Sequence, residues 1–272
     1  MKEFDNMENP EITEIRKYRE FAMQIAKDAG EYMLSRHGEV QKIEYKLRTD
    51  FKTDTDDKLD RLLREKIAQQ YPGHSIYSEE LPPEIKDSEY AWVYDPLDGT
   101  FNFTNGFLGM FSVSIGLVKG REAIMGVVNV PSMGEFFSAQ KGEGAYMNNQ
   151  RIKVSETVDV NKAMVAMDFG KLNRQRGVKY YNRMLAADGV RYPAVYACTS
   201  VSIMQVANGR LDAYISSSAE PWDYAGSVPI AREAGARVTT LEGKEWQLGD
   251  ESMLVANPAL HQKLSSMFSE VA

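Results

Sequence analysis

The chain has 272 residues, of which 43% are apolar and 26% are charged, a composition typical of a soluble globular protein. This composition excludes a disordered or collagen-like chain, and no stretch of the sequence is long and apolar enough to span a membrane. The 32 basic and 39 acidic residues give a net charge of −7, which argues against nucleic acid or an anionic bilayer as a partner. We therefore expect any anionic ligand to be bound by local groups.

The N-terminal sequence and the cysteine content favour a cytoplasmic location. The segment MKEFDNMENPEITEIRKY is charged and lacks the apolar run of a secretory signal. Cys198 is the only cysteine, so internal disulfides and a cysteine-rich zinc site are excluded. We predict that Cys198 is a small residue of the core.

The N-terminal part predicts two helices followed by two strands. Apolar residues at three- and four-residue steps indicate a long amphipathic helix over residues 12–33. A second helix is predicted from near residue 56 to the Pro-Gly pair at 72–73, which ends it. Short strands are predicted at 75–77 and 91–94, and both run directly into acidic residues.

The stretch 111–154 predicts an antiparallel meander. Its β-rich runs are SVSIGLV, IMGVVNV, GEFFSA and RIKVS, and KGEGAYMNNQ is among the predicted turns. After about residue 155 the pattern changes to alternating strand and helix. The strands predicted there are MVAMD, YAC, DAYIS and ARVTT, and the helices lie near residues 180–187, 202–208 and 224–234.

These patterns predict a mixed α+β and α/β fold in a single domain over residues 1–272. An α+β half spans about residues 10–154, and an α/β half spans about residues 155–272. No internal repeat, low-complexity tract or flexible linker separates them. We therefore expect one rigid body with a cleft between the halves.

The segment WVYDPLDGT, residues 92–100, is the most informative in the chain. Pro96 cannot donate to a strand ladder, so we expect the strand to stop at Asp95 and the chain to turn sharply. Asp95 and Asp98 then share one side of the turn, and such a pair repels unless a cation lies between them. Oxygen ligands favour Mg²⁺ or Mn²⁺ over Zn²⁺. A bare turn is the alternative, because Asp, Pro and Gly are ordinary turn residues.

Neighbouring groups could extend such a site. The Leu97 carbonyl lies between the two aspartates and is a candidate further ligand. The amides of Gly99 and Thr100 can point at an anion if a helical turn begins there. Glu79 follows a strand that we expect to lie beside the strand ending in Asp95, so metal and phosphate could meet at this place.

Other acidic residues near helix starts have two interpretations. Asp223 lies where a helix should begin, and its carboxylate either caps that helix or reaches the same metal cluster. Asp54, Asp57 and Asp60 precede or begin the second helix, and we interpret them as a solvated cap that suits the helix dipole.

Four segments resemble the inositol monophosphatase family of magnesium-dependent, lithium-sensitive phosphomonoesterases. They are YPGHSIYSEE, WVYDPLDGTFNFTNGF, ANGRLDAY and PWDYAGSVPIAREAG, and TDFKTDTDDKLDRLL is similar to the family's metal-proximal second helix. The resemblance extends over about residues 18–264. It implies the layered αβαβα sugar-phosphatase fold, Mg²⁺ as the cofactor with Mn²⁺ as a substitute, and a homodimer.

The resemblance also implies catalytic and metal-binding residues. Asp56 and Thr100 would orient and deprotonate the attacking water, with Glu79 assisting. The metal ligands would be Glu79, Asp95, Leu97 through its carbonyl, Asp98 and Asp223. Clustered Mg²⁺ fits this chemistry, because a phosphate monoester repels external nucleophiles and the cations both neutralise it and lower the pKa of bound water.

The substrate pocket is where this sequence departs from the family. The residues implied to contact the substrate are Asp98, Gly99, Thr100, Thr199 and Asp223. Ser216 stands where inositol-specific members often place a glutamate, and Glu220 either replaces that glutamate or faces solvent. Lys52 replaces an apolar residue and is interpreted as a surface substitution.

Together these features predict a Mg²⁺-dependent phosphomonoesterase of a small phosphorylated polyol or sugar, with myo-inositol 1-phosphate as the leading substrate. Fructose 1,6-bisphosphate, 3′-phosphoadenosine 5′-phosphate, as for a 3′(2′),5′-bisphosphate nucleotidase, and histidinol phosphate are alternatives from the same family. A non-catalytic phosphate-binding regulatory protein is the alternative of a different class. That alternative predicts a damaged ligand set, whereas the matching acidic residues are all present.

Overall fold

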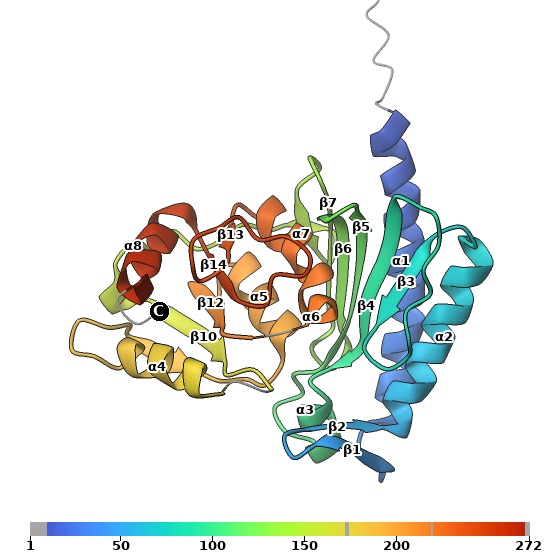
Figure 1. Cartoon of the computed structure of the whole chain (residues 1–272), viewed down its shortest axis with the longest axis horizontal. Helices are drawn as coiled ribbons and strands as arrows, with labels where there is room; N and C mark the ends of the chain where they lie inside the picture. The colour runs from blue at the N-terminus through green and yellow to red at the C-terminus, as the bar shows by residue number, and fades with distance from the viewer. Residues whose placement is uncertain (1–9, 172–173, 219, 270–272) are drawn as a thin grey trace, which may run out of the picture.

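Two β-sheets and the helices on their faces form the body of the computed structural model, which describes residues 10–171, 174–218 and 220–269 (Figure 1). Residues 1–9, the first half of the charged N-terminal segment, lie outside the described residues. Within the described residues no helix is long and apolar enough to cross a membrane. The sheets and helices stack in layers because each element buries its apolar face against a neighbouring element.

The larger sheet has seven strands in the order β3-β4-β5-β6-β7-β8-β9. The first pair, β3 and β4, is parallel, and every later neighbour is antiparallel, which confirms the predicted meander. Its strands are β3 (Ser75–Ser78), β4 (Tyr90–Asp98), β5 (Ser112–Lys119), β6 (Glu122–Val130), β7 (Glu135–Gln140), β8 (Ala145–Met147) and β9 (Gln150–Arg151).

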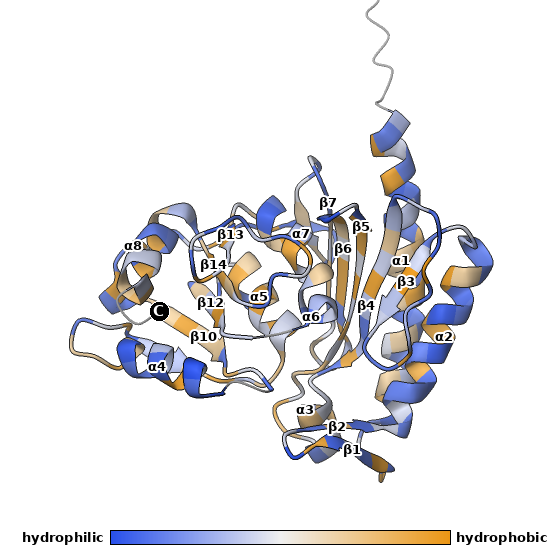
Figure 2. Cartoon of the chain, in the orientation of Figure 1, coloured by the Kyte–Doolittle hydropathy of each residue, from blue (hydrophilic) through white to orange (hydrophobic). Residues whose placement is uncertain are grey.

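Two long helices, α1 (Pro10–Arg36) and α2 (Asp54–Gln70), cover the outer face of this sheet, and both helices were predicted. Their buried residues recur at helical spacing and pack with Trp92, Ile115 and other sheet residues in one hydrophobic cluster. Figure 2 shows hydrophilic residues on the side of α2 that faces away from the sheet. In the sequence, α1 and α2 are connected by a hairpin of β1 (Ile43–Leu47) and β2 (Asp50–Thr53), which the sequence patterns did not predict.

The second sheet has five strands in the order β11-β10-β12-β14-β13. The neighbours of β10 are parallel to it, whereas β14 is antiparallel to both of its neighbours. Helices α4 (Arg174–Met184) and α8 (Pro258–Ser269) pack on its outer face. The strands are β10 (Met164–Asp168), β11 (Tyr192–Ala194), β12 (Ala213–Ser216), β13 (Arg237–Thr239) and β14 (Met253–Ala256).

Three helices lie between the two sheets and are buried by both (Figure 1). They are α5 (Thr199–Ala207), α6 (Pro221–Ala225) and α7 (Ser227–Glu233). All nine residues of α5 are buried, as expected for a helix that has a sheet on either side. The order of layers is therefore helix, sheet, helix, sheet, helix, which confirms the αβαβα fold.

The junction of α6 and α7 lies directly against the larger sheet, and glycines make this approach possible. Gly116 and Gly126 are cross-strand partners on β5 and β6. A Cβ atom at Gly126 would lie 1.9 Å from the carbonyl oxygen of Gly226, and one at Gly116 would lie 2.4 Å from that of Ala225. Because only glycine fits at these positions, the pair fixes how closely the junction of α6 and α7 approaches the larger sheet.

One strand and one helix differ from the predictions, and a proline lies at each of the two places. Strand β4 does not stop at Asp95 but continues to Asp98. The ladder to β5 shifts register between these two residues, so Pro96 lies in a bulge. The helix predicted over 224–234 is instead two helices that meet at Gly226. Pro229 has no N–H to donate to the Ala225 carbonyl, which accounts for the interruption.

Two further predictions about strands were wrong. Part of the predicted turn KGEGAYMNNQ forms β8, because Ala145 pairs with β7. The predicted strand YAC is not a strand, and β11 lies just before it. Ala197 within that segment has a positive φ of 52°, a conformation incompatible with a strand.

Candidate active site

A cavity of about 360 Å³ opens where the two sheets meet the β1–β2 hairpin. Its lining comes from the hairpin, the ends of β3, β4, β10 and β12, and the starts of α3 (Thr100–Asn105), α5 and α6. The cleft expected between the two parts of the chain is therefore present. The candidate residues that line it are Glu79, Asp95, Leu97, Asp98, Gly99, Thr100, Thr199 and Asp223.

The bulge in β4 brings Asp95 and Asp98 to the same cavity. Asp95 is 2% exposed, and its Oδ1 accepts a hydrogen bond of 2.9 Å from the Leu97 amide, which holds the bulge in shape. Burial raises the pKa of Asp95 well above its ordinary value, and the charges of Glu79, Asp98 and Asp223 raise it further. These four carboxylates thus act on one another electrostatically.

Asp98 is also bound to the beginning of α5. Its Oδ2 accepts hydrogen bonds from the Ser200 amide at 2.6 Å and the Ser200 hydroxyl at 2.5 Å, and its Oδ1 accepts one from the Thr199 amide at 3.3 Å. Burial raises the pKa of Asp98, and the bonds from Ser200 oppose this rise. The carboxylate therefore joins the end of β4 to the start of α5 across the cavity.

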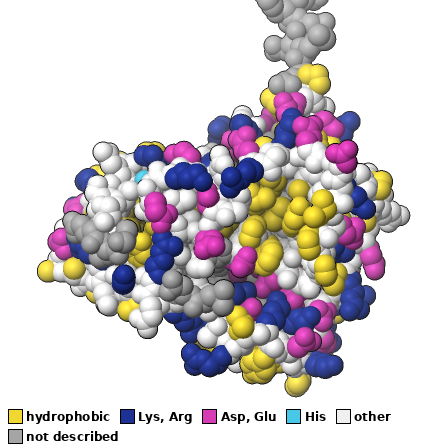
Figure 3. All heavy atoms as spheres, in the orientation of Figure 1, with side chains coloured by type: hydrophobic (Ala, Val, Ile, Leu, Met, Phe, Trp, Pro, Cys, Tyr) yellow, Lys and Arg dark blue, Asp and Glu magenta, His cyan; other side chains and the backbone are white. Residues whose placement is uncertain are grey.

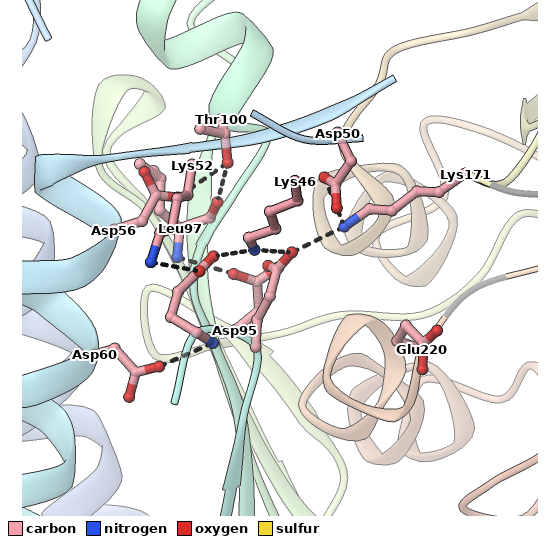
Figure 4. A network of polar contacts seen from close by, with 12 residues as sticks. Lys46, Asp50, Lys52, Asp56, Asp60, Asp95, Leu97, Thr100, Lys171 and Glu220 are labelled. Atoms are coloured by element: carbon pink, nitrogen blue, oxygen red, sulfur yellow. Dashed lines mark hydrogen bonds and ion pairs between the residues drawn. The ribbon is translucent and has the colours of Figure 1, made fainter. Parts of the chain in front are cut away.

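Glu79 follows β3 at the position next to Asp95, as the parallel pairing of Ser78 with Tyr94 requires. Two ammonium groups neutralise it: Lys171 Nζ lies 2.8 Å and Lys46 Nζ 3.3 Å from Glu79 Oε1 (Figure 4). Burial alone would raise the pKa of Glu79, but the two lysines outweigh burial and lower it.

Thr100 connects the cavity to a buried aspartate behind it. The Thr100 hydroxyl lies 3.1 Å from Asp56 Oδ1 and 3.0 Å from the Leu97 carbonyl oxygen (Figure 4). The other carboxylate oxygen of Asp56 accepts a 2.8 Å bond from the Thr53 amide in a capping box at the start of α2. Burial raises the pKa of Asp56 to about 6. Asp56 thus faces the cavity only through the Thr100 hydroxyl.

Gly99 stands at the turn between β4 and α3, and only glycine fits there. Its φ is +86°, and a Cβ atom would lie 2.5 Å from the Met110 carbonyl oxygen. The following residue, Thr100, begins α3, so the helical turn on which the anion-binding interpretation of the Gly99 and Thr100 amides depends is present.

Asp223 is placed by the short helix α6. Its Oδ2 accepts a 2.8 Å bond from the Glu220 amide, so Asp223 closes a capping box and also lines the cavity. The two interpretations of this residue are therefore compatible. Burial raises its pKa to about 8, although the Lys171 charge opposes the rise.

The sequence patterns missed Asp168 and Lys171. Asp168 ends β10 in the cavity wall, where its Oδ2 accepts bonds from Tyr214 at 2.9 Å and Thr199 at 3.3 Å. Burial raises the pKa of Asp168 to about 6. The signal was present, because MVAMD is a predicted strand that ends in a carboxylate, like those before Glu79 and Asp95.

Two interpretations of charged residues near α2 need correction. Asp60 is not solvated: it is fully buried and accepts bonds from the Tyr94 hydroxyl at 2.7 Å and the Glu80 amide at 3.1 Å. Lys52 is not a free surface residue either, since its side chain is 17% exposed and lies 2.8 Å from Asp57. Neither residue lines the main cavity.

Ser216 and Glu220 both line the cavity, but differently. Ser216 is fully buried at the end of β12, whereas Glu220 is exposed at its mouth (Figure 4). The apolar part of the lining includes Phe51, Phe101 and Phe169. The cavity is thus lined by both carboxylates and aromatic side chains.

The donor set fits a hard divalent cation. The acidic side chains offer oxygen only. Burial and the charges of neighbouring carboxylates raise the pKa values of Asp95 and Asp223, and a cation would relieve this repulsion. In the part of the chain that the structure describes, no three acidic, histidine or cysteine side chains are gathered closely enough to hold an ion as they stand. The carboxylate-rich cavity of this five-layer fold is therefore the candidate active site.

Comparisons with known proteins identify the family. Residues 14–271 match the model of the inositol monophosphatase family. A fructose-1,6-bisphosphatase/inositol-1-monophosphatase of Aquifex aeolicus is 34% identical over 268 residues, covering 95% of this chain and 98% of that protein. A Neisseria meningitidis protein named "Putative Nus factor SuhB" is 30% identical over 256 residues, covering 91% and 96%.

Solved structures agree with the sequence relatives. The Thermotoga maritima IMPase has a TM-score of 0.84 and 27% identity, covering 93% of this chain and 96% of that one. The extragenic suppressor protein suhB from Bartonella henselae has a TM-score of 0.87 and 26% identity, covering 93% and 98%. The chain belongs to the inositol monophosphatase family and is a phosphoric monoester hydrolase.

Proposed function

We propose that this enzyme is a Mg²⁺-dependent phosphatase of a small phosphorylated polyol or sugar, with myo-inositol 1-phosphate as its leading substrate. The observation that carries the proposal is the Thr100 hydroxyl, which lies between Asp56 and the Leu97 carbonyl in the wall of the acidic cavity. Such an arrangement can activate water beside a phosphate. The family is generally Mg²⁺-dependent, which supports the cofactor.

In this proposal the side chains and amides around the cavity have separate functions in the reaction. The Thr100 hydroxyl donates to Asp56 and accepts a hydrogen bond from the attacking water, so Asp56 receives the proton through Thr100. The amides of Gly99 and Thr100 orient the phosphate at the start of α3. Asp98, Thr199 and Asp223 contact the alcohol portion of the substrate.

Glu79, Asp95, the Leu97 carbonyl, Asp98 and Asp223 would hold the metal. When bound, Mg²⁺ supplies Lewis-acid neutralisation of the phosphate charge and lowers the pKa of water. Mn²⁺ would substitute, because it takes the same oxygen ligands. Glu79 additionally assists in positioning the attacking water. We assign all of these residues to one domain that spans the whole chain.

A panel of phosphate esters tests the proposal. Purified protein is assayed for phosphate release from inositol 1-phosphate, fructose 1,6-bisphosphate, 3′-phosphoadenosine 5′-phosphate and histidinol phosphate, each with Mg²⁺, with EDTA and with added Li⁺. We expect Mg²⁺-dependent, Li⁺-suppressed release that is fastest with inositol 1-phosphate. A tenfold preference for another ester would overturn the assignment of inositol 1-phosphate as the leading substrate. Release from none of the esters would count against the catalytic proposal.

A regulatory function is the second candidate, supported by the relative that is named "Putative Nus factor SuhB". It predicts that biological activity survives loss of turnover. Asp95→Asn removes a proposed metal ligand while preserving the size of the side chain. Full biological activity of that variant, with no phosphate release, would favour the regulatory function.

We also propose a homodimer in the cytoplasm. Figure 3 shows hydrophobic side chains gathered on the visible face of the larger sheet, beside α6. Tyr77, Ala91, Trp222 and Leu248 are partly buried hydrophobic residues of one cluster in this region. Sedimentation at twice the mass of the chain would support the dimer, whereas a monomer at micromolar concentration would contradict it.

A further inference from the structure

Lys171 reaches into the acidic cavity from the opposite side. It follows β10, whereas its two carboxylate partners belong to the N-terminal part of the chain. Its Nζ lies 2.8 Å from Glu79 Oε1 and 3.1 Å from Asp50 Oδ1 (Figure 4). The side chain is 39% exposed, while that of Glu79 is only 10% exposed. An ammonium group therefore crosses the cleft to a nearly buried carboxylate.

The charge of Lys171 acts on most of the acidic site. The ammonium lowers the pKa of Glu79, and it opposes the rise that burial causes in the pKa values of Asp95 and Asp223. The charges of Glu79, Asp223 and Asp50 in turn raise the pKa of Lys171, although partial desolvation of the ammonium opposes this rise. Lys171 is thus the internal counter-ion of three of the proposed metal-binding side chains.

Lys46 also contacts Glu79 but has a different principal partner. Its Nζ lies 2.6 Å from Glu80 Oε1 and 3.3 Å from Glu79 Oε1. Lys171 lines the main cavity, whereas Lys46 lines only a smaller pocket beside it. A cation that enters the main cavity and binds Glu79 therefore meets the Lys171 ammonium.

We propose that Lys171 competes with the divalent metal for Glu79 and thereby sets the concentration of Mg²⁺ that the enzyme requires. This inference rests on the proposed function, because it takes Glu79 as a metal ligand. Metal binding replaces the contact between Lys171 and Glu79, and the contact with Asp50 gives the displaced ammonium a remaining partner. The competition follows from charge, since two cations that share one carboxylate repel each other.

The test measures Mg²⁺ binding to metal-free protein by titration calorimetry. Lys171→Gln removes the competing charge, and we expect its dissociation constant for Mg²⁺ to fall by about fivefold or more, within the usual range of coupling between two ligands. Lys171→Arg keeps the charge and should bind Mg²⁺ like the unmodified protein. Lys52→Gln is the matched control, because Lys52 pairs with Asp57 outside the main cavity.

Thermal unfolding provides a second readout that does not depend on catalysis. In EDTA, Lys171→Gln should melt below the unmodified protein, since Glu79 loses a counter-ion. In saturating Mg²⁺ the variant should gain more melting temperature than the unmodified protein gains, because its metal binds more tightly.

The outcomes separate this inference from the proposed function. Equal or weaker Mg²⁺ binding by Lys171→Gln, with clear binding by the unmodified protein, overturns the competition and leaves the metal-dependent function standing. If Lys52→Gln also binds Mg²⁺ more tightly, the effect is one of overall charge, and the proposed competition between Lys171 and the metal is overturned. No Mg²⁺ binding by any of the proteins overturns the proposed metal chemistry, and this inference with it.

Discussion

At the scale of single residues, the hydroxyl of Thr100 is the group through which the buried Asp56 acts on the cavity. Asp56 is 1% exposed, and its second carboxylate oxygen is occupied by Thr53. The two residues are 44 positions apart in the sequence and meet because α2 begins beside the end of β4. Their hydrogen bond is the basis of two predictions.

Thr100→Val should remove the proton path while keeping the shape of the side chain. We expect kcat to fall by roughly 10²-fold to 10⁴-fold, the usual contribution of a positioned general base, with a small change in melting temperature. Thr100→Ser retains the hydroxyl and should keep most of the activity. Phosphate release and thermal unfolding are the two measurements, and full activity of Thr100→Val would show that Asp56 acts by another route.

The pH dependence of the reaction follows from the pKa of Asp56. Burial raises this pKa to about 6, and Asp56 accepts a proton only when it is ionised. Activity should therefore fall as the pH drops through 6, and bound Mg²⁺ would move this midpoint lower by stabilising the carboxylate. A profile of kcat/KM against pH checks the sign. Activity that rises between pH 7 and pH 5 would show that the essential group acts in its protonated form.

At the scale of elements, two glycines on neighbouring strands decide where α6 lies. The α6–α7 junction contacts β5 and β6 through backbone atoms at Gly116 and Gly126, and Asp223 is carried by α6. The position of a proposed metal ligand thus depends on residues of the larger sheet. The pattern GLV and GVV within predicted strands gave no sign of this approach.

Gly126→Ala should displace α6 and destabilise the fold. A Cβ atom there would lie 1.9 Å from a backbone oxygen that has no side-chain freedom, and overpacking of this kind costs about 1–3 kcal/mol or more. We expect a lower free energy of unfolding in urea, together with loss of phosphatase activity through Asp223. Gly73→Ala is the control, because no atom lies within 4 Å of its Cβ position. Equal stability of the two variants would refute the close approach.

At the scale of the whole molecule, the acidic cavity couples metal binding to folding. Burial and mutual repulsion raise the pKa values of Asp95 and Asp223 in the folded chain. The ionised form of these side chains therefore costs more free energy in the folded chain than in the unfolded chain. A cation that binds only the folded protein relieves this cost. The stability of the molecule should therefore depend on Mg²⁺.

Mg²⁺ should raise the melting temperature of the metal-free protein. Ligand at 100 times its dissociation constant contributes about 2.7 kcal/mol to the folded state. For a chain of this size we expect a shift of about 5–10 °C, measured by calorimetry with and without EDTA. K⁺ at the same ionic strength controls for screening. An unchanged melting temperature in Mg²⁺ would mean that the carboxylates do not bind the ion.

The sequence by itself determined the family, the order of most elements and the residues of the candidate site. Periodicity was sufficient for α1, α2 and the meander, because each buries one face in a regular pattern. The motif around Asp95 and Asp98 was readable because its chemistry is local. The family motifs led to Asp56, Glu79, Thr199 and Asp223, and all four lie in or directly behind the cavity.

Only the tertiary structure decided which charges meet across the cleft. The burial of Asp60, the position of Asp168 and the contact of Lys171 with Glu79 all join segments that are far apart in the chain. Sequence patterns report which face of an element is buried, but not which side chain of another element lies opposite. The balance of charge in the site depends on those distances, since electrostatic interactions fall off with separation and strengthen with burial.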